Sequence, residues 1–500
     1  MRAVQHRVRA WLPLLLILAL AAGLRLAGLE RQSLWNDELS TLVRADAADL
    51  ADLLRTGIAQ DGHPPAYLTL IYLVERTLGR SAWALRLPSA LAGVLSVALI
   101  YGLARRLRPA DPVRGHDEGL IAAALMAVLW APVYYSQEAR PYAFVILLSL
   151  AVTCAYIPLL PLRGRPQPRA REVAAYVAAA LLAAYTHYFG LVLVMIQAAA
   201  LALLAFAARR NRGPAIAAYA VFALGYAPWV VHLAGQVSGQ LADPLPRPAA
   251  DVLFQFLLHV FNSSRLLAGG AALLWLAAAV LWLWQAAPGT RRLGLRPTLA
   301  DAWATWLLLG WLILPPALAL VESWLLLPIV ALRYLLVSLP PAYLLLARAF
   351  SALPLPRPGR LLAAGALVVL CLFHLLGPID YYNRPTKQQF REAAFYVADH
   401  AAEYPDALVV ANVWSKDYLD YYFEAAGSPV RVDLLAAGAE DAPALVAALA
   451  QRHPRYVWYI ALHRKTASAL LADLDARLTL VAEQPFIGGW VRLYEATDAR

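Results

Sequence analysis

Long apolar blocks alternate with short polar segments over the first three quarters of the chain. A helix rises about 1.5 Å per residue, so about 20 apolar residues cross the hydrocarbon core of a bilayer. Eleven blocks are close to this length, at residues 10–28, 83–104, 118–135, 141–162, 172–188, 189–208, 214–234, 266–285, 299–321, 334–350 and 361–377. The pattern predicts a polytopic α-helical membrane protein with about eleven transmembrane helices.

Arginines recur in alternate loops between these blocks, and cytoplasmic loops of membrane proteins carry an excess of Lys and Arg. The arginine-rich segments are the N-terminus and alternate loops, among them residues 105–114, 209–212 and 348–360. We predict a multi-pass protein of the inner (plasma) membrane with a cytoplasmic N-terminus, because the N-terminus is rich in arginine. Since the number of predicted spans is odd, the chain beyond residue 378 would be extracytoplasmic.

The first block also suits a cleavable signal peptide. Arg2, Arg7 and Arg9 precede the apolar run, and Ala19-Leu20-Ala21 resembles a small-residue cleavage site. Cleavage would leave the orientation of every later segment unchanged.

Composition supports the membrane assignment and removes other classes. Of the 500 residues, 61% are hydrophobic and 15% charged, whereas soluble globular proteins average about 45–50% apolar residues. Most of the arginines behind the net charge of +10 lie in short loops, so the charge marks topology and implies no nucleic-acid partner. Cys154 and Cys371 both lie in apolar blocks, which excludes a disulfide framework or a cysteine metal cluster.

Two regions on the predicted outer side are too long and polar to be simple connectors. The first outer loop, residues 29–82, contains amphipathic stretches that we expect to lie along the membrane surface. From about Thr386, short β-rich runs alternate with helical segments, which is typical of a small α/β domain. These runs are residues 407–411, 430–432, 456–460 and 478–481. We predict a transmembrane module over residues 1–377 and an extracytoplasmic α/β domain over residues 378–500.

Charged side chains are costly inside a bilayer, so those beside the outer ends of spans are candidates for a functional site. The charged candidates are Asp37, Glu38, Glu138, Arg140 and Arg333, and the imidazole and phenol candidates are His63, Tyr142, His187, Tyr188 and Tyr334. A partly desolvated carboxylate can accept a proton from a hydroxyl or hold a metal, while Arg and His can bind a phosphate. The combination favours group transfer from a phosphate.

Each candidate also has a structural interpretation. Asp37 and Glu38 suit the N-terminus of a surface helix, where acidic side chains cap N–H groups and meet the helix dipole. Glu138 and Arg140 suit a surface pair, Arg333 suits an interfacial anchor, and His187 suits an interfacial histidine. We prefer the functional interpretation because all of these residues converge on one predicted side of the membrane.

Several short motifs together resemble one superfamily. The motifs are Trp35-Asn36-Asp37-Glu38, His63-Pro64-Pro65, Arg86-Leu87-Pro88-Ser89-Ala90, Ser136-Gln137-Glu138-Ala139-Arg140-Pro141-Tyr142, Tyr185-Thr186-His187-Tyr188-Phe189 and Arg333-Tyr334. Their order and spacing over about residues 10–350 are similar to those of the dolichyl-phosphate-mannose protein O-mannosyltransferases and aminoarabinose lipid A transferases, a glycosyltransferase family 39-like group.

This resemblance implies a GT-C fold and an inverting glycosyltransferase. The enzyme would move a hexosyl or pentosyl group from a polyprenyl-phosphate donor to a lipid, glycan or protein acceptor in the cell envelope. The resemblance makes Asp37 the catalytic base or acceptor organiser and Glu38 its partner. Glu138 would be a second outer-loop acid and Arg140 a phosphate contact. The remaining candidates would lie around the donor phosphate.

One departure from the superfamily concerns cofactors. The lipid A transferases have Glu-Lys-Pro-Pro where this chain has Gly62-His63-Pro64-Pro65, so that motif's acidic metal ligand and phosphate-binding lysine have no counterpart here. We therefore assign no cofactor. A divalent metal stays open, with Glu38, Glu138 and His187 as candidate ligands.

Two other functional classes fit parts of the pattern. A transporter or flippase of lipid-linked saccharides would also be rich in spans. However, transporters place charges or broken helices near the bilayer midplane and show internal repeats, whereas the charges here gather at one face. A scaffold protein with a partner-binding outer domain would not need eleven spans for its anchor.

Overall fold

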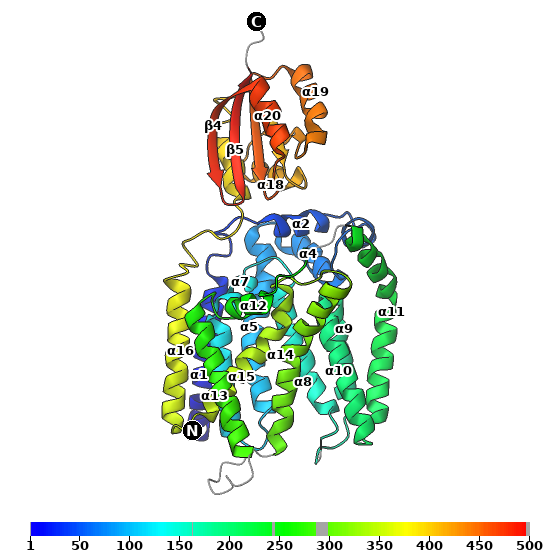
Figure 1. Cartoon of the computed structure of the whole chain (residues 1–500), viewed down its shortest axis with the longest axis vertical. Coiled ribbons are helices and arrows are strands. Elements are labelled where there is room, and N and C mark those ends of the chain that lie inside the picture. Colours follow the sequence, from blue (N-terminus) through cyan, green and yellow to red (C-terminus); the bar gives the residue numbers. More distant parts are fainter. Residues whose placement is uncertain (1, 163, 243–245, 287–298, 497–500) are drawn as a thin grey trace. The chain divides into compact units, whose positions relative to one another are not determined.

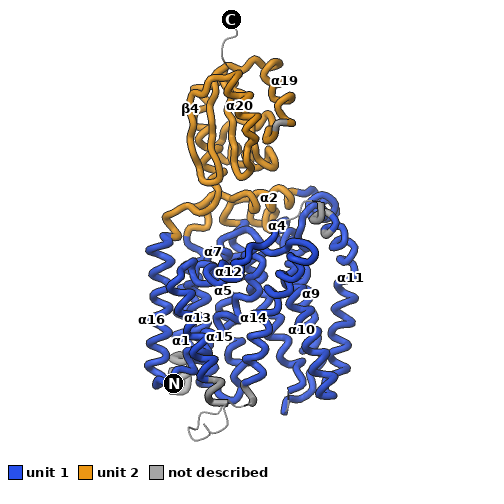
Figure 2. The backbone as a smooth tube through the Cα atoms, viewed as in Figure 1, with its two compact units in different colours: residues 1–27, 47–73, 85–380 blue, residues 28–46, 74–84, 381–500 orange. Residues whose placement is uncertain are grey.

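The structure is a computed structural model that describes residues 2–162, 164–242, 246–286 and 299–496 (Figure 1). The last four residues of the predicted α/β domain lie outside the described residues. By contacts within the chain, the protein forms two compact units (Figure 2). Unit 1 comprises Met1–Ala27, Ala47–Leu73 and Leu85–Asp380, and unit 2 comprises Gly28–Asp46, Val74–Ala84 and Tyr381–Arg500.

Unit 1 is built from helices, and helical structure coincides with every predicted apolar block. Its longer helices are α1 (Arg2–Leu26), α5 (Ala82–Arg106), α6 (Pro112–Val128), α8 (Tyr142–Tyr156), α9 (Ala170–Thr186), α10 (Tyr188–Ala207), α11 (Arg212–Ala242), α13 (Arg265–Ala286), α14 (Leu299–Leu325), α15 (Leu339–Ala352) and α16 (Arg357–Leu376). Shorter elements are α3 (Leu50–Asp52), η1 (Leu53–Ile58), α4 (Pro65–Leu78), α7 (Trp130–Ser136), η2 (Ile157–Leu159), α12 (Val252–Val260) and η4 (Tyr334–Ser338). The end of α4 and the first residues of α5 belong to unit 2.

Fewer helices than predicted meet the length and composition expected of a membrane span. Among the described residues seven do, or up to nine if each of two bent helix pairs counts as one span. The apolar part of α1, Trp11–Leu26, and the 17-residue helix α9 are shorter than the usual span. The structure thus has the apolar helices of a multi-pass membrane protein, and the predicted count of eleven is not confirmed.

Both bent pairs have a local cause. Helices α6 and α7 meet at 59° where Leu129 takes an extended conformation, and Pro132 offers no N–H to the carbonyl of Val128. Helices α12 and α13 meet at 97° around Asn262, a residue with positive φ. The Asn262 side chain accepts a hydrogen bond from the Trp130 N–H at 2.6 Å. The residue at the α12–α13 break therefore satisfies a backbone N–H that the α6–α7 break leaves without a helical acceptor.

Unit 2 contains a five-stranded sheet in the order β2-β1-β3-β5-β4. The strands are β1 (Leu408–Asn412), β2 (Leu434–Leu435), β3 (Tyr456–Leu462), β4 (Leu478–Phe486) and β5 (Gly489–Ala496). Strands β2 and β3 pair with β1 in parallel, and β5 pairs with β3 and β4 in antiparallel. The accompanying helices are α17 (Phe390–Asp399), α18 (Asp417–Ala425), α19 (Ala442–Arg452) and α20 (Ser468–Arg477), with the turn η5 (Ala439–Asp441).

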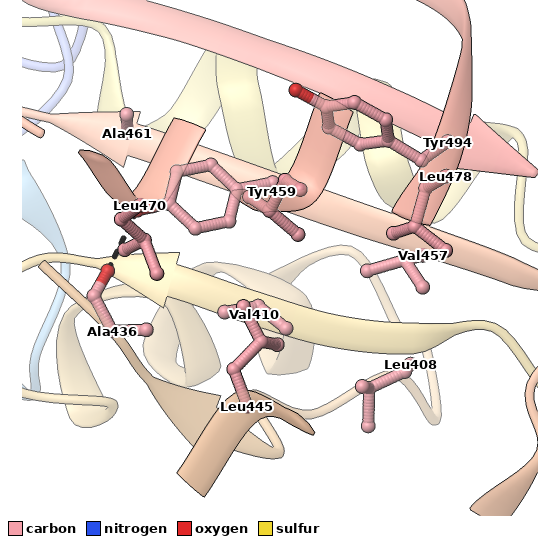
Figure 3. Close-up of a cluster of buried hydrophobic side chains, with 11 residues drawn as sticks. Leu408, Val410, Ala436, Leu445, Val457, Tyr459, Ala461, Leu470, Leu478 and Tyr494 are labelled. Carbon is pink, nitrogen blue, oxygen red and sulfur yellow. Dashed lines mark hydrogen bonds between the residues drawn. The ribbon is translucent and has the colours of Figure 1, made fainter. Parts of the chain in front are cut away.

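The small α/β fold expected near the C-terminus is confirmed, with two errors in its strands. The expected strand at residues 430–432 is wrong, because β2 lies at Leu434–Leu435, and β5 was not predicted. The core of the sheet includes Val410, Val457 and Tyr459, whose hydroxyl donates to the Ala436 carbonyl at 2.7 Å (Figure 3).

Unit 2 also includes α2 (Asn36–Ala45) from the first outer loop, and α2 contacts α18. The boundary at residue 378 stays a prediction. By contacts, residues 28–46 and 74–84 group with the C-terminal residues. The candidate carboxylates Asp37 and Glu38 therefore belong to unit 2, and the other candidate residues to unit 1.

Candidate active site

Four chain segments of unit 1 bring the predicted donor-binding residues together. His63 follows η1, Arg140 and Tyr142 lie at the start of α8, His187 lies between α9 and α10, and Tyr334 opens η4. The ring centroids of His63 and His187 are 5.7 Å apart, and those of His187 and Tyr334 are 5.2 Å apart. We call these five residues the cationic cluster.

His63 connects an acid to Arg140. Its Nδ1 lies 2.9 Å from Asp61 Oδ1, and its Nε2 lies 3.4 Å from an Arg140 Nη2 atom. A neutral imidazole satisfies both contacts, because Nδ1–H donates to the carboxylate while Nε2 accepts from the guanidinium. Asp61 thus orients the ring of His63, and His63 in turn contacts the guanidinium.

His187 is fixed as a hydrogen-bond donor. The side chain is only 3% exposed, and the backbone N–H of Phe189 donates to its Nδ1 at 3.1 Å. Burial, reinforced by His63, Arg140 and Arg333, lowers the pKa of His187 well below its ordinary value. Because Nδ1 accepts the hydrogen bond from Phe189, the ring carries its proton on Nε2. Among the described residues that buried atom has no hydrogen-bond partner, so it can serve a ligand.

Two members of the cationic cluster, Tyr142 and Tyr334, are aromatic and lie close to His187. The Tyr142 centroid lies 6.3 Å from that of His187 and 6.4 Å from that of Tyr334. The guanidinium carbons of Arg140 and Arg333 lie 6.0 Å from the Tyr142 centroid and 5.5 Å from the Tyr334 centroid, respectively. Both distances allow cation–π attraction, which holds the two cations beside the rings.

A cavity of about 720 Å³ adjoins the cluster within unit 1. His63, His187 and Tyr334 line it, together with Tyr188. Apolar side chains form much of the remaining wall, and Asp61, His232, Gln236 and Glu322 add polar groups. The Tyr188 hydroxyl donates to Gln236, whose amide donates to the backbone carbonyl of Asp61. The cavity can therefore accept a ligand with one charged and one apolar part.

Two reciprocal contacts hold the segment that carries Glu138 and Arg140. Arg25, at the end of α1, is fully buried, and its guanidinium donates to the carbonyls of Met126 at 2.7 Å and Ala127 at 3.0 Å. These are carbonyls that the α6–α7 break leaves without helical partners. In return the Gln137 amide donates to the carbonyls of Arg25 at 3.0 Å and Ala27 at 2.8 Å, which end α1.

Helix α5 packs closely against the same segment. A Cβ at Gly93 would collide with Ser136 Oγ and with the Arg25 guanidinium, so only glycine permits this approach. Ser89, one turn earlier on α5, donates to the Arg140 carbonyl at 3.3 Å. Glu138 lies in the held segment and is 1% exposed. The segment therefore has a fixed backbone from which Arg140 reaches His63.

In unit 2, Asp37 and Glu38 occupy the first turn of α2 and have different surroundings. Asp37 is half-buried, and the Asn36 amide donates to its Oδ1 at 3.3 Å. Glu38 is 0% exposed, accepts from the Trp35 N–H at 3.4 Å and lies 3.2 Å from Lys387 Nζ. The two acids thus begin a helix, as their structural interpretation requires. Of the two, Asp37 is the one that a substrate can reach more easily.

The described residues contain no group of three or more His, Cys, Asp or Glu side chains that could share a metal ion. The candidate ligands Glu38, Glu138 and His187 do not form such a group. Their role as metal ligands stays a prediction, and we assign no step of the reaction to a metal.

Several contributing residues were not predicted. Asp61 stands two positions before His63, yet an acid in a polar loop has no distinctive sequence signal. Gln236 and Arg25 reach the site from distant helices. Lys387 pairs with Glu38 across 349 positions. For Arg25 the sequence offers one signal that could have been used, namely a charged residue near the end of an apolar block.

Comparison with known proteins supports the family resemblance. Residues 62–232 match a family model described as dolichyl-phosphate-mannose-protein mannosyltransferase. The matched segment contains His63, Glu138, Arg140, His187 and their neighbouring tyrosines. No curated protein matches the sequence at a significant level.

Solved structures share the fold at low sequence identity. ArnT from Cupriavidus metallidurans in the apo state has a TM-score of 0.58 at 11% identity, covering 97% of this chain and 98% of that chain. The same protein bound to undecaprenyl phosphate has a TM-score of 0.56 with the same identity and coverage.

The archaeal oligosaccharyltransferase AglB from Archaeoglobus fulgidus, in complex with an inhibitory peptide and a dolichol-phosphate, has a TM-score of 0.52. It is 12% identical, over 99% of this chain and 75% of that chain. These findings confirm the resemblance to the GT-C glycosyltransferases and to the protein mannosyltransferase family.

Proposed function

We propose that this protein is an integral membrane glycosyltransferase that takes a hexosyl or pentosyl group from a polyprenyl-phosphate donor and inverts the anomeric centre. The acceptor is a lipid, glycan or protein hydroxyl in the cell envelope. The observation that carries the proposal is the cationic cluster, which places a guanidinium and a free imidazole N–H of unit 1 beside a cavity with apolar walls.

The chemistry of the cluster suits a lipid phosphate. An arginine makes paired, charge-assisted hydrogen bonds with phosphate oxygens, and a buried neutral histidine donates one more. The apolar wall of the cavity suits the first isoprene units. ArnT, which shares the fold, has been solved with undecaprenyl phosphate, and AglB with a dolichol-phosphate, so lipid phosphates are ligands of proteins with this architecture.

In the proposed reaction, the acceptor hydroxyl oxygen attacks the anomeric carbon from the face opposite the phosphate. Its proton passes to the carboxylate of Asp37, which acts as general base. The bond between the anomeric carbon and the phosphate oxygen breaks, and the polyprenyl phosphate leaves with the bonding electrons. Arg140, with Arg333 nearby, stabilises the charge that develops on the departing phosphate.

The test is incubation of the purified protein with a panel of radiolabelled polyprenyl-phosphate sugars and membrane extract. We expect one donor to be consumed, polyprenyl phosphate to be released, and the sugar to appear on an acceptor with inverted configuration. A transporter would move the lipid-linked sugar without consuming it. Intact donor across the whole panel would therefore contradict the proposal.

We further propose that the reaction takes place on the extracytoplasmic side of the inner (plasma) membrane, with the N-terminus in the cytoplasm. Leu50→Cys and Ala402→Cys, both at exposed positions, are expected to react with an impermeant thiol reagent in intact cells. Ala208→Cys, exposed between α10 and α11, is the control and should react only after permeabilisation. Both native cysteines are buried, which keeps the background low. Protection of either outer position would refute this orientation.

A further inference from the structure

We propose that Lys387 and Gln388 are positioning residues for the candidate base Asp37. They precede the α/β fold of unit 2, and we call them the clamp residues. The inference rests on the proposed function for its catalytic consequence. It gives the C-terminal part of the chain a role in the reaction, namely to hold α2.

The first contact is a buried ion pair. Lys387 Nζ lies 3.2 Å from Glu38 Oε2, and the two residues are 5% and 0% exposed. Removing one member of a buried ion pair is costly, because the charge that remains loses a partner away from water. Glu38 also accepts from the Trp35 N–H. The lysine therefore fixes the carboxylate that begins α2, next to Asp37.

The second contact is made by the side chain and backbone of Gln388. Its Oε1 accepts from the Asn36 N–H at 3.2 Å, and its backbone carbonyl accepts from the Ser33 hydroxyl at 2.6 Å. The first N–H groups of a helix have no partner within the helix, so Gln388 acts as an external cap. The capped residue immediately precedes Asp37.

The clamp residues are themselves held from both sides. The N–H groups of Thr386 and Lys387 donate to Gln32 Oε1 at 2.8 Å and 2.9 Å. On the other side the Gln388 amide donates to His463 Nδ1 at 2.7 Å, directly after β3. A Cβ at Gly488 would collide with the Gln388 side chain, so the β4–β5 turn packs tightly against it. The sheet of unit 2 thus supports the start of α2.

Such support matters because α2 has only ten residues. Isolated helices of that length are marginal in water, so tertiary contacts determine the direction of its first turn. A general base displaced by about 1 Å can cost up to about 10²-fold in rate. Loss of the clamp should therefore slow the chemical step without touching the donor site of unit 1.

The test compares Lys387→Met, Lys387→Arg and Gln388→Met with wild type, and uses exposed Lys465→Met as the matched control. We expect kcat to fall about 10- to 100-fold in Lys387→Met and to recover largely in Lys387→Arg, which keeps the charge. Affinity for undecaprenyl phosphate should be unchanged in all variants. Wild-type kcat in both Lys387→Met and Gln388→Met, or equal losses of kcat and lipid affinity, would overturn the inference.

Hydrogen exchange on the same full-length proteins gives a readout that does not depend on activity. The clamp predicts faster exchange for residues 36–45 in Lys387→Met and Gln388→Met, with β3 and α10 as protected as in wild type. Unchanged protection of α2, or equal loss of protection in α2 and β3, would contradict it. If the wild-type protein transfers no sugar from any donor, the proposed function fails while the exchange data still decide the clamp.

Discussion

An Asp37→Asn variant is expected to fold and to bind donor but to transfer sugar about 10²–10⁴-fold more slowly than wild type, the usual cost of losing a general base. Asparagine keeps the shape and the hydrogen bonding of the side chain but cannot accept the acceptor's proton. The measurement is single-turnover transfer with donor binding determined in parallel. Near-normal turnover would remove Asp37 from the mechanism.

Two further variants make this result specific. Glu30→Gln changes an exposed acid in the same outer loop and should leave turnover unaltered. Glu38→Gln removes a buried acid that caps α2 and pairs with Lys387, so we expect a smaller loss of rate than in Asp37→Asn. A more severe effect in Glu38→Gln would mean that the roles of the two acids are reversed.

Arg140→Ala is expected to weaken binding of undecaprenyl phosphate by about 10- to 100-fold, because one hydrogen bond to a charged group contributes about 1.5–3 kcal/mol. Arg140→Lys should weaken binding less than Arg140→Ala. It restores the positive charge but not the paired geometry of the guanidinium. The measurement is equilibrium binding of radiolabelled lipid phosphate to the purified variants.

The control for Arg140 is Arg247→Ala, which removes an exposed arginine of the same unit and should bind like wild type. It separates a specific contact from a general loss of positive charge. Equal affinity of wild type and Arg140→Ala would contradict the assignment of Arg140.

The helices of unit 1 could be predicted because a bilayer demands continuous apolar stretches, and hydropathy reports these directly. The breaks within these helices could not be predicted. Averaged hydropathy does not show that the backbone turns at Leu129 or at Asn262, where long-range contacts replace the lost helical hydrogen bonds. In unit 2, β5 escaped prediction because Arg492 and Glu495 interrupt the apolar run expected of a strand.

The motifs predicted that His63, Arg140 and His187 lie close together, but not that Asp37 and Glu38 group with the C-terminal residues. That these residues form a substrate site stays a prediction. Chemistry-bearing residues such as His63, Arg140 and His187 lie beside span ends, and their convergence follows from a shared side of the membrane. The pairing of Glu38 with Lys387, or of Gln137 with the end of α1, depends on tertiary contacts across most of the chain. No local pattern encodes such contacts.

The most direct test of the central claim compares undecaprenyl phosphate with undecaprenol, which has the same isoprenoid chain without the phosphate. If the cationic cluster binds the lipid phosphate, wild type binds undecaprenyl phosphate far more tightly than undecaprenol, and Arg140→Ala loses most of that difference. Equal affinity of wild type for the two lipids would show that the cluster does not recognise phosphate and would contradict the account.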